Sequence, residues 1–173
     1  MIATREGRVE DSVQYFQQAL KLSPRHVLSL DNLGNAYRVQ KKWADARTVL
    51  ERALSIAPTD AEANYSLGMV YAQTQNTDKA YEYLQRALKA RPDYPEALNN
   101  LGVLYVMTER RDQARQTFEQ CIHVAPAFDQ AYLNLARIYA LQGEREKARA
   151  ILSELLKQHP DHAPAKQMLQ QLE

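Results

Sequence analysis

Histidines and a cysteine, the usual metal ligands and nucleophiles, mark two places where chemistry could occur. His159 and His162 flank Pro160 in the run His-Pro-Asp-His. A zinc site takes at least three strong protein ligands, and we find no further strong ligand close to the two imidazoles in the sequence. The pattern therefore favours solvated residues of a connecting segment over a metal site.

Cys121 and His123 could pair as a nucleophile and its base. Residues two positions apart on a helix point to different faces, so the pair cannot meet there. The sequence also holds no glycine-rich phosphate loop, no serine elbow and no paired catalytic carboxylates. We therefore expect no enzymatic activity, no cofactor and no bound metal.

Composition narrows the classes of partner. The 173 residues include 22 Lys and Arg against 21 Asp and Glu, so the formal net charge of +1 offers no field for a nucleic acid. A single cysteine excludes an internal disulfide. No stretch is as long and apolar as a membrane span. These features predict a soluble, cytoplasmic protein without nucleic-acid or membrane partners.

A fixed period organises the chain. Five prolines follow one another at intervals of 34 residues: Pro24, Pro58, Pro92, Pro126 and Pro160. Counting repeats from residue 27, other columns keep the same register. Position seven is always Leu, position eight is Gly or Ala, position eleven is Tyr, position twenty is Ala and position twenty-four is Leu or Phe. In order, these columns are Leu33, Leu67, Leu101, Leu135; Gly34, Gly68, Gly102, Ala136; Tyr37, Tyr71, Tyr105, Tyr139; Ala46, Ala80, Ala114, Ala148; and Leu50, Leu84, Phe118, Leu152.

Each column has a physical explanation. Residues three and four positions apart share a helix face, so positions seven, eight and eleven form one stripe of a first helix. We expect the small residue at position eight to face the Ala at position twenty of a second helix, which lets the two backbones approach closely. The proline then ends the second helix, because it lacks an N–H group and its ring blocks continuation.

These columns resemble the signature of the tetratricopeptide repeat family over nearly the whole chain. The resemblance implies an all-α fold, a right-handed superhelical α-solenoid of antiparallel helix pairs. It predicts a partial repeat at 1–26 that is mainly a second helix, full repeats at 27–60, 61–94, 95–128 and 129–162, and a capping helix at 163–173.

The N-terminal edge of this array is the expected weak point. Residues 8–22 match a second helix whose first helix is reduced to residues 1–5. Its apolar residues Val13, Phe16 and Leu20 would then lack part of their cover. We interpret this edge either as part of a longer array or as a surface that meets a partner chain. In the second case the chain could associate with a second copy of itself through this edge.

Family resemblance also implies where a ligand would bind. Positions two, five, six, nine, twelve and thirteen of the first helices line a concave groove in such proteins. Position six is Asn in three of the four repeats, a pattern similar to the asparagine ladder in the repeats of the O-linked N-acetylglucosamine transferase, although exposed Asn residues can also simply face water. The candidate groove residues are Asn32, Asn35, Tyr65, Ser66, Met69, Asn100, Val103, Asn134 and Arg137.

The chemistry of the groove predicts its ligand. The carboxylate clamp of the family needs cations at set positions, and neither possible register supplies one. The groove instead mixes the acids Asp31, Glu62 and Glu96 with apolar side chains that include Met107 and Leu133. We therefore expect an extended, neutral or mildly basic segment with apolar anchors.

Three functions stay open on the sequence alone. The leading one is a non-catalytic scaffold that binds an extended peptide or partner protein. The second is the substrate-selecting segment of a larger enzyme, such as a glycosyltransferase. The third is an RNA-binding helical repeat, which the near-zero net charge disfavours.

Overall fold

The computed structural model describes residues 2–172, with side chains from residue 8 onward. The described residues form ten α-helices and no strand, which confirms the all-α prediction. The helices are α1 (Ile2–Leu22), α2 (Val27–Val39), α3 (Trp43–Ile56), α4 (Ala61–Gln73), α5 (Thr77–Ala90), α6 (Pro95–Met107), α7 (Arg111–Val124), α8 (Asp129–Leu141), α9 (Arg145–Gln158) and α10 (Ala163–Gln170).

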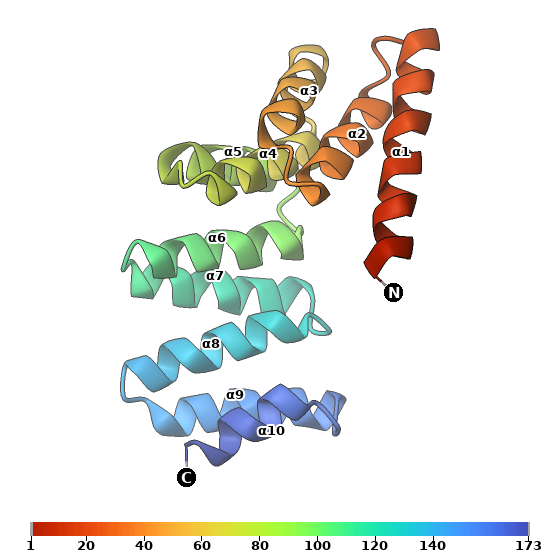
Figure 1. The fold of residues 1–173 in the computed structure, drawn as a ribbon. Coiled ribbons are helices and arrows are strands. Elements are labelled where there is room, and N and C mark those ends of the chain that lie inside the picture. Colours follow the sequence, from red (N-terminus) through yellow and green to blue (C-terminus); the bar gives the residue numbers. More distant parts are fainter. Residues whose placement is uncertain (1, 173) are drawn as a thin grey trace. The chain divides into compact units, whose positions relative to one another are not determined.

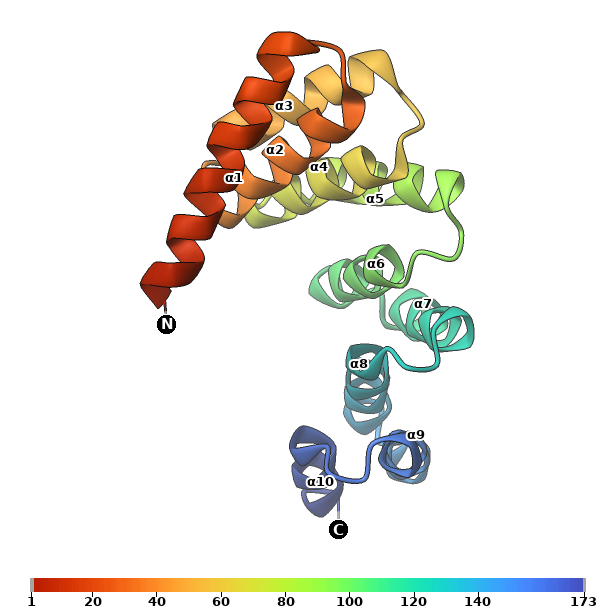
Figure 2. The same ribbon diagram turned by 90° about the vertical axis from the view of Figure 1, so that its right-hand side faces the viewer.

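The helices fall into two compact units, Met1–Pro92 and Asp93–Glu173. In the first unit, α2 pairs with α3 and α4 pairs with α5, each pair antiparallel across a short turn, and α1 packs on α2 (Figure 1). In the second unit, α6 pairs with α7 and α8 with α9, and α10 packs on α9. Figure 2 shows this second unit nearly along its helix axes, with α6, α8 and α10 in one layer and α7 and α9 in the other. We call α2, α4, α6 and α8 the first helices of the repeats.

The two helices of a pair pack tightly at position eight. A Cβ atom built on Gly102 would lie 2.5 Å from a ring carbon of Phe118. A Cβ on Gly34 would lie equally close to Leu50 Cγ, at 2.5 Å. The nearest side chain therefore belongs to position twenty-four, and not to the alanine of position twenty as we expected. The Leu or Phe at position twenty-four fills the space beside the glycine. The alanines of position twenty are fully buried as well, and close packing there leaves room only for a small side chain.

The turn inside each repeat has a feature that the columns did not reveal. Position fifteen has a positive φ in all four repeats, at 58° to 60° for Lys41, Gln75 and Glu109 and 78° for Gly143. Only the last of these is the glycine that this left-handed conformation favours. The following N–H group donates to the carbonyl of the position-eleven tyrosine, at 2.8 to 2.9 Å, which closes the first helix.

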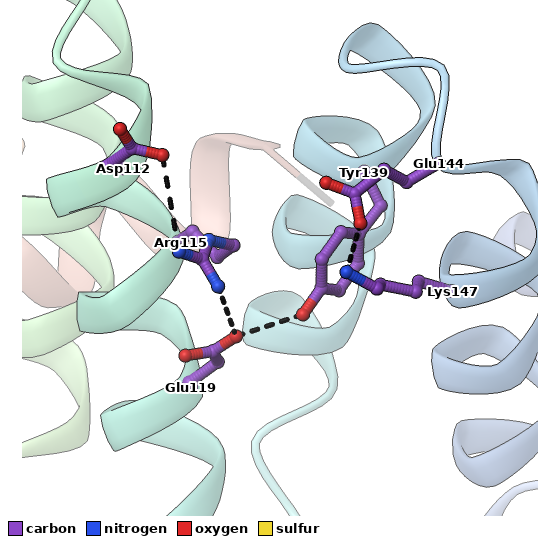
Figure 3. Close-up of polar contacts among 6 residues, drawn as sticks. All are labelled: Asp112, Arg115, Glu119, Tyr139, Glu144 and Lys147. Carbon is purple, nitrogen blue, oxygen red and sulfur yellow. Dashed lines mark hydrogen bonds and ion pairs between the residues drawn. The ribbon is translucent and has the colours of Figure 1, made fainter.

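The tyrosine column also ties neighbouring repeats together. The Tyr139 hydroxyl of α8 donates to Glu119 Oε1 of α7 at 2.9 Å, and Arg115 pairs with the same carboxylate at 3.6 Å (Figure 3). Lys147 of α9 pairs with Glu144 and lies 5.5 Å from the centre of the Tyr139 ring. Tyr71 and Glu51 repeat this bond in the first unit at 3.3 Å, and Tyr37 accepts one there from Gln17 at 2.8 Å. The polar end of the column is thus used inside the fold.

Both ends of the chain carry an additional helix. Residues 2–22 form one uninterrupted helix, where we expected a separate short segment before residue 8; this stretch has no proline to break it. Met1 lies outside the described residues. Val13 and Leu20 are buried, so the apolar face that we expected to be open is covered in part. In α10, the capping helix, Ala165 is buried and Met168 and Leu169 are half-buried.

The contact at position eight can be tested in the second unit. Gly102→Ala should destabilise the protein by about 1–3 kcal/mol, because the added methyl group meets a packed aromatic ring. Repeat four already combines Ala136 with Leu152, both fully buried. The double variant Gly102→Ala/Phe118→Leu should therefore recover most of the loss. Urea unfolding followed by circular dichroism measures both, with Phe118→Leu alone as the control. A double variant that is no more stable than Gly102→Ala would contradict this packing.

Candidate functional site

Exposed apolar side chains concentrate on the first helices. Among the described residues, the large apolar side chains that stand exposed are Tyr15, Leu22, Leu28, Val39, Val103, Val106, Met107 and Leu141. The first two lie on α1. The other six all lie on first helices, at positions two, nine, twelve and thirteen, and none lies on α3, α5, α7 or α9. In three of the four pairs the first helix, α2, α6 or α8, therefore carries exposed large apolar side chains while its second helix carries none; the described residues of α4 include none.

The largest group of these side chains is in the second unit. Val103, Val106 and Met107 occupy the last two turns of α6, and Met107 is 69% exposed. Leu141, at the corresponding end of α8, is 65% exposed. Helices α6 and α8 contact each other directly. Arg137 of α8 is exposed on the same helix. We call the surface formed by Val103, Val106, Met107, Arg137 and Leu141 the α6–α8 face.

The asparagines of the second unit are already engaged inside it. Asn134 Nδ2 donates to Asn99 Oδ1 at 2.9 Å, and Asn134 Oδ1 accepts from Gln130 at 3.3 Å. Asn100 Nδ2 donates to the carbonyl of Glu96 one turn earlier, at 2.8 Å. Asn99 stands at position five and its bond joins α6 to α8, a role that the sequence analysis missed. An amide oxygen and an amide nitrogen can each make two hydrogen bonds, so Asn134 retains capacity for a second partner.

The candidate residues of the first unit differ in accessibility. Asn35 is exposed, and its Oδ1 accepts two hydrogen bonds from Arg38 at 2.7 and 3.1 Å. Asn32, Tyr65 and Met69 are half-buried, whereas Ser66 is buried. Position six therefore does not present four equivalent amides to solvent.

Asp31 is the most unusual of these side chains. We expected it to be one of three acids of an open groove, but it is only 7% exposed. Two acids act on it electrostatically: Asp60, which caps α4 by accepting from Ala63 N at 2.8 Å, and Glu62 in the first turn of that helix. Burial and the charge of Asp60, with which it shares a hydrogen bond, raise the pKa of Asp31 from 3.8 to about 7, and Glu62 adds to the shift. Oδ1 of Asp31 has no hydrogen-bond partner among the described residues.

Two further expectations change. Leu133, which we placed in the groove, is buried at 7% exposure, because position five packs between neighbouring helices.

His159 and His162 are also more than solvated loop residues. Their Nε2 atoms lie 3.3 and 3.6 Å from the carboxylate of Asp129, at the start of α8. His162 Nδ1 in addition caps α10 by accepting from Ala165 N at 3.2 Å.

Neither the histidines nor the cysteine forms a chemical centre in the part of the chain that the structure describes. Among the side chains described, those of residues 8–172, no group of three or more His, Cys, Asp or Glu is arranged to hold a metal ion. Cys121 is fully buried and its thiol lies 3.3 Å from the Pro95 carbonyl. Burial raises the pKa of this thiol to about 11, so the nucleophilic thiolate is scarce at neutral pH. Across residues 2–172, no helix has the length and hydropathy that a membrane span requires.

Comparison with known proteins decides the family. A sequence profile described as "Tetratricopeptide repeat protein 21 N-terminal ARM repeat" matches residues 1–168, nearly the whole chain. The chain belongs to the tetratricopeptide repeat family. A search of curated proteins finds no match to the chain.

Solved tetratricopeptide repeat structures share the fold. The crystal structure of MamA is 27% identical, with a TM-score of 0.79 over 92% of this chain and 94% of MamA. YrrB, described as a TPR protein with an unusual peptide-binding site, is 25% identical, with a TM-score of 0.72 over 96% of this chain and 86% of YrrB. A tetratricopeptide repeat protein from Parabacteroides merdae is 22% identical, with a TM-score of 0.77 over 98% of this chain and 67% of its own, and supports the fold alone.

The buried acid of the first tetratricopeptide repeat should make stability depend on pH. A carboxyl whose pKa is raised on folding stabilises the folded state while it is protonated. Its contribution is therefore complete below pH 3.8 and is lost as the pH rises through about 7. Asp31→Asn should remove this dependence and should stabilise the protein at pH 8 by on the order of 2 kcal/mol. Position five of repeat three is already Asn99, so the amide suits this site.

Thermal melting between pH 4 and pH 8 measures this effect. Asp45→Asn is the matched control, because Asp45 is an exposed acid on the second helix of the same repeat. Parallel pH profiles for the wild type and Asp31→Asn would show that Asp31 is not the group responsible.

Proposed function

We propose that this chain is a non-catalytic interaction scaffold that binds an extended peptide or a segment of a partner protein on its first helices. One observation carries the proposal. Every exposed large apolar side chain described outside α1 lies on a first helix, at a position that lines the binding groove in proteins of this family. Exposed apolar surface concentrated on one layer of a fold is typical of an interaction site.

The α6–α8 face is the best candidate for the centre of the interaction. Met107 and Leu141 offer flexible, exposed apolar surface for an anchor side chain of the ligand. Asn134 can add a hydrogen bond to the ligand backbone beside them, and Arg137 a charged contact. An extended segment suits this arrangement, because apolar anchors would supply the binding energy and the amides would align the backbone.

The comparisons are consistent with this proposal. YrrB has a peptide-binding site according to its description, and it covers nearly the whole chain at 25% identity. We therefore propose protein or peptide partners for this chain. Asn100 would have a supporting role beside the α6–α8 face, and Asn32, Asn35, Tyr65, Ser66 and Met69 stay candidates for ligand contacts of the first unit.

A peptide library tests the role of the α6–α8 face. The probe is a positional-scanning library of N-acetylated, C-amidated octapeptides, selected on the immobilised protein and quantified by mass spectrometry. Wild type should enrich pools with Leu, Ile or Phe at one or two positions. The double variant Met107→Ser/Leu141→Ser should weaken their binding about tenfold or more, since two apolar contacts are lost.

Tyr15→Ser/Leu22→Ser is the matched control, because it removes two equally exposed apolar side chains from α1. It should leave enrichment unchanged, and both double variants should melt close to the wild type. Equal enrichment by the wild type and Met107→Ser/Leu141→Ser would exclude this face as the binding surface.

A further inference from the structure

Arg137 is a charged side chain on an otherwise apolar surface. It is exposed on α8, and among the described residues it has no hydrogen-bond or ion-pair partner. Arg115 of α7, in contrast, pairs with Asp112 and Glu119 at 4.0 and 3.6 Å. In the part of the chain that the structure describes, no acid therefore balances the charge of Arg137.

Helix geometry places Arg137 among the apolar side chains of the α6–α8 face. It stands at position nine, one turn before Leu141, and residues four apart lie on the same side of a helix. Val103 holds position nine of α6, and Met107 follows it at the same spacing. Helices α6 and α8 contact each other in one layer (Figure 2). The four side chains therefore form a patch with one charged and three apolar members.

The acids of the same layer lie away from this patch or are already paired. Glu96 is in the first turn of α6, roughly 16 Å of helix rise before Met107. Asp129 begins α8, roughly 12 Å of helix rise before Arg137, and two histidine imidazoles lie 3.3 and 3.6 Å from its carboxylate. At the start of α10, Asp161 pairs with Lys166 at 3.3 Å.

The turns that follow the two helices carry acids beside cations. Glu109, after α6, is followed directly by Arg110 and Arg111 in the sequence. Glu144, after α8, pairs with Lys147. Neither turn brings a net negative charge to the patch, so the local charge beside its apolar side chains is positive.

A purely apolar ligand would bind this patch poorly. A ligand side chain that covers Val103 or Leu141 also removes water from the neighbouring Arg137 guanidinium. A guanidinium that loses water without gaining an acceptor weakens the complex. A carboxylate restores the lost interactions, because it can accept two parallel charge-assisted hydrogen bonds from one guanidinium. The patch therefore favours a ligand in which an acid accompanies the apolar anchor.

We propose that Arg137 is a specificity-determining residue of the α6–α8 face and binds the side-chain carboxylate of an aspartate or glutamate in the bound segment. The inference rests on the proposed function, because the apolar anchor brings the acid to the face. All the contacts that it requires lie within the second unit.

The size of the patch sets the spacing of the two ligand residues. Side chains one turn apart on a helix are about 6 Å apart, and the axes of packed helices are about 8–10 Å apart. An extended chain advances about 3.3 Å per residue. The acid should therefore stand two or three positions from the apolar anchor.

This role narrows the ligand expected from the sequence. A neutral or mildly basic segment was expected because of Asp31, Glu62 and Glu96. The first two belong to the first unit, and Glu96 is at the far end of α6 from Met107. One carboxylate in an otherwise uncharged segment suits the face, whereas a uniformly basic segment would be repelled by Arg137.

Matched octapeptide pools test this role. The peptides are N-acetylated and C-amidated, have one fixed leucine as the anchor, and carry Glu, Gln or Lys two or three positions from it. Wild type should enrich Glu over Gln about fivefold or more at one of these positions, the scale of one charge-assisted contact. The preference should shrink between about 0.05 M and about 0.5 M NaCl, because salt screens charges.

Variants of the arginine assign the preference. Arg137→Gln should remove it, and Arg137→Glu should reverse it, so that Lys is enriched over Gln. Arg145→Glu is the matched control, because Arg145 is an exposed arginine on α9, the second helix of the same repeat, and the change in net charge is the same as in Arg137→Glu. This control should keep the preference for Glu. Circular dichroism confirms that each variant is folded.

A further set of peptides ends in a free C-terminal carboxylate and has no acidic side chain. Enrichment of this set over the pools with Glu would assign Arg137 to chain ends and overturn the proposal. Enrichment of leucine-containing pools without a preference for Glu also overturns it and leaves the scaffold function intact, and so does a preference for Glu that survives in Arg137→Gln. A library from which nothing is enriched overturns both proposals.

Discussion

The close approach of the two helices at position eight is the constraint on which the rest of the structure depends. In the first three repeats glycine stands here. The side chain of position twenty-four comes within 2.5 Å of where a Cβ atom would be at Gly34 and Gly102, and within 3.1 Å at Gly68. This contact brings the backbones of the two helices close together. Within each unit, neighbouring pairs then stack through the remaining apolar surface, so contacts between adjacent repeats of a unit add to its stability.

This packing also gives the two helices of a repeat different roles. The second helix of a repeat buries its apolar side chains against its own first helix, as Leu50 beside Gly34 and Phe118 beside Gly102 show. Within each unit, α3 and α7 also contact the first helix of the following repeat. Hydroxyl groups of the position-eleven tyrosines form hydrogen bonds within the fold, such as that from Tyr139 to Glu119. The first helices are left with apolar side chains, such as Met107 and Leu141, that no neighbouring repeat covers. The binding surface that we propose is thus a consequence of how the pairs pack.

Sequence alone predicted the elements well, because the 34-residue period places helices and breaks independently of distant contacts. It missed features that depend on which neighbour faces a residue. The partner of position eight is a large side chain, and the pairing of His159 and His162 with Asp129 joins residues 30 or more positions apart in the sequence. The positive φ at position fifteen was hidden because three of the four residues are not glycine.

The accessibility of the candidate residues was predicted in part. The exposed positions of Val103 and Arg137 agree with the first-helix surface, whereas Asp31 and Leu133 are buried. Both buried residues stand at position five, where helical periodicity places a side chain at the boundary between the surface and the neighbouring helix. Whether a side chain at position five is exposed or buried depends on the residues of the neighbouring repeat. The hydrophobic pattern of a single helix holds no information about those residues.

The central claim is that ligands bind the first helices while the second helices only support them. Methyl NMR spectra of the protein, titrated with the most enriched octapeptide, test this most directly. We expect shifts at the methyl groups of Val103, Met107 and Leu141, and unchanged signals from Val49 and Ile122 on the second helices. Shifts confined to methyl groups of α3, α5, α7 and α9 would contradict it.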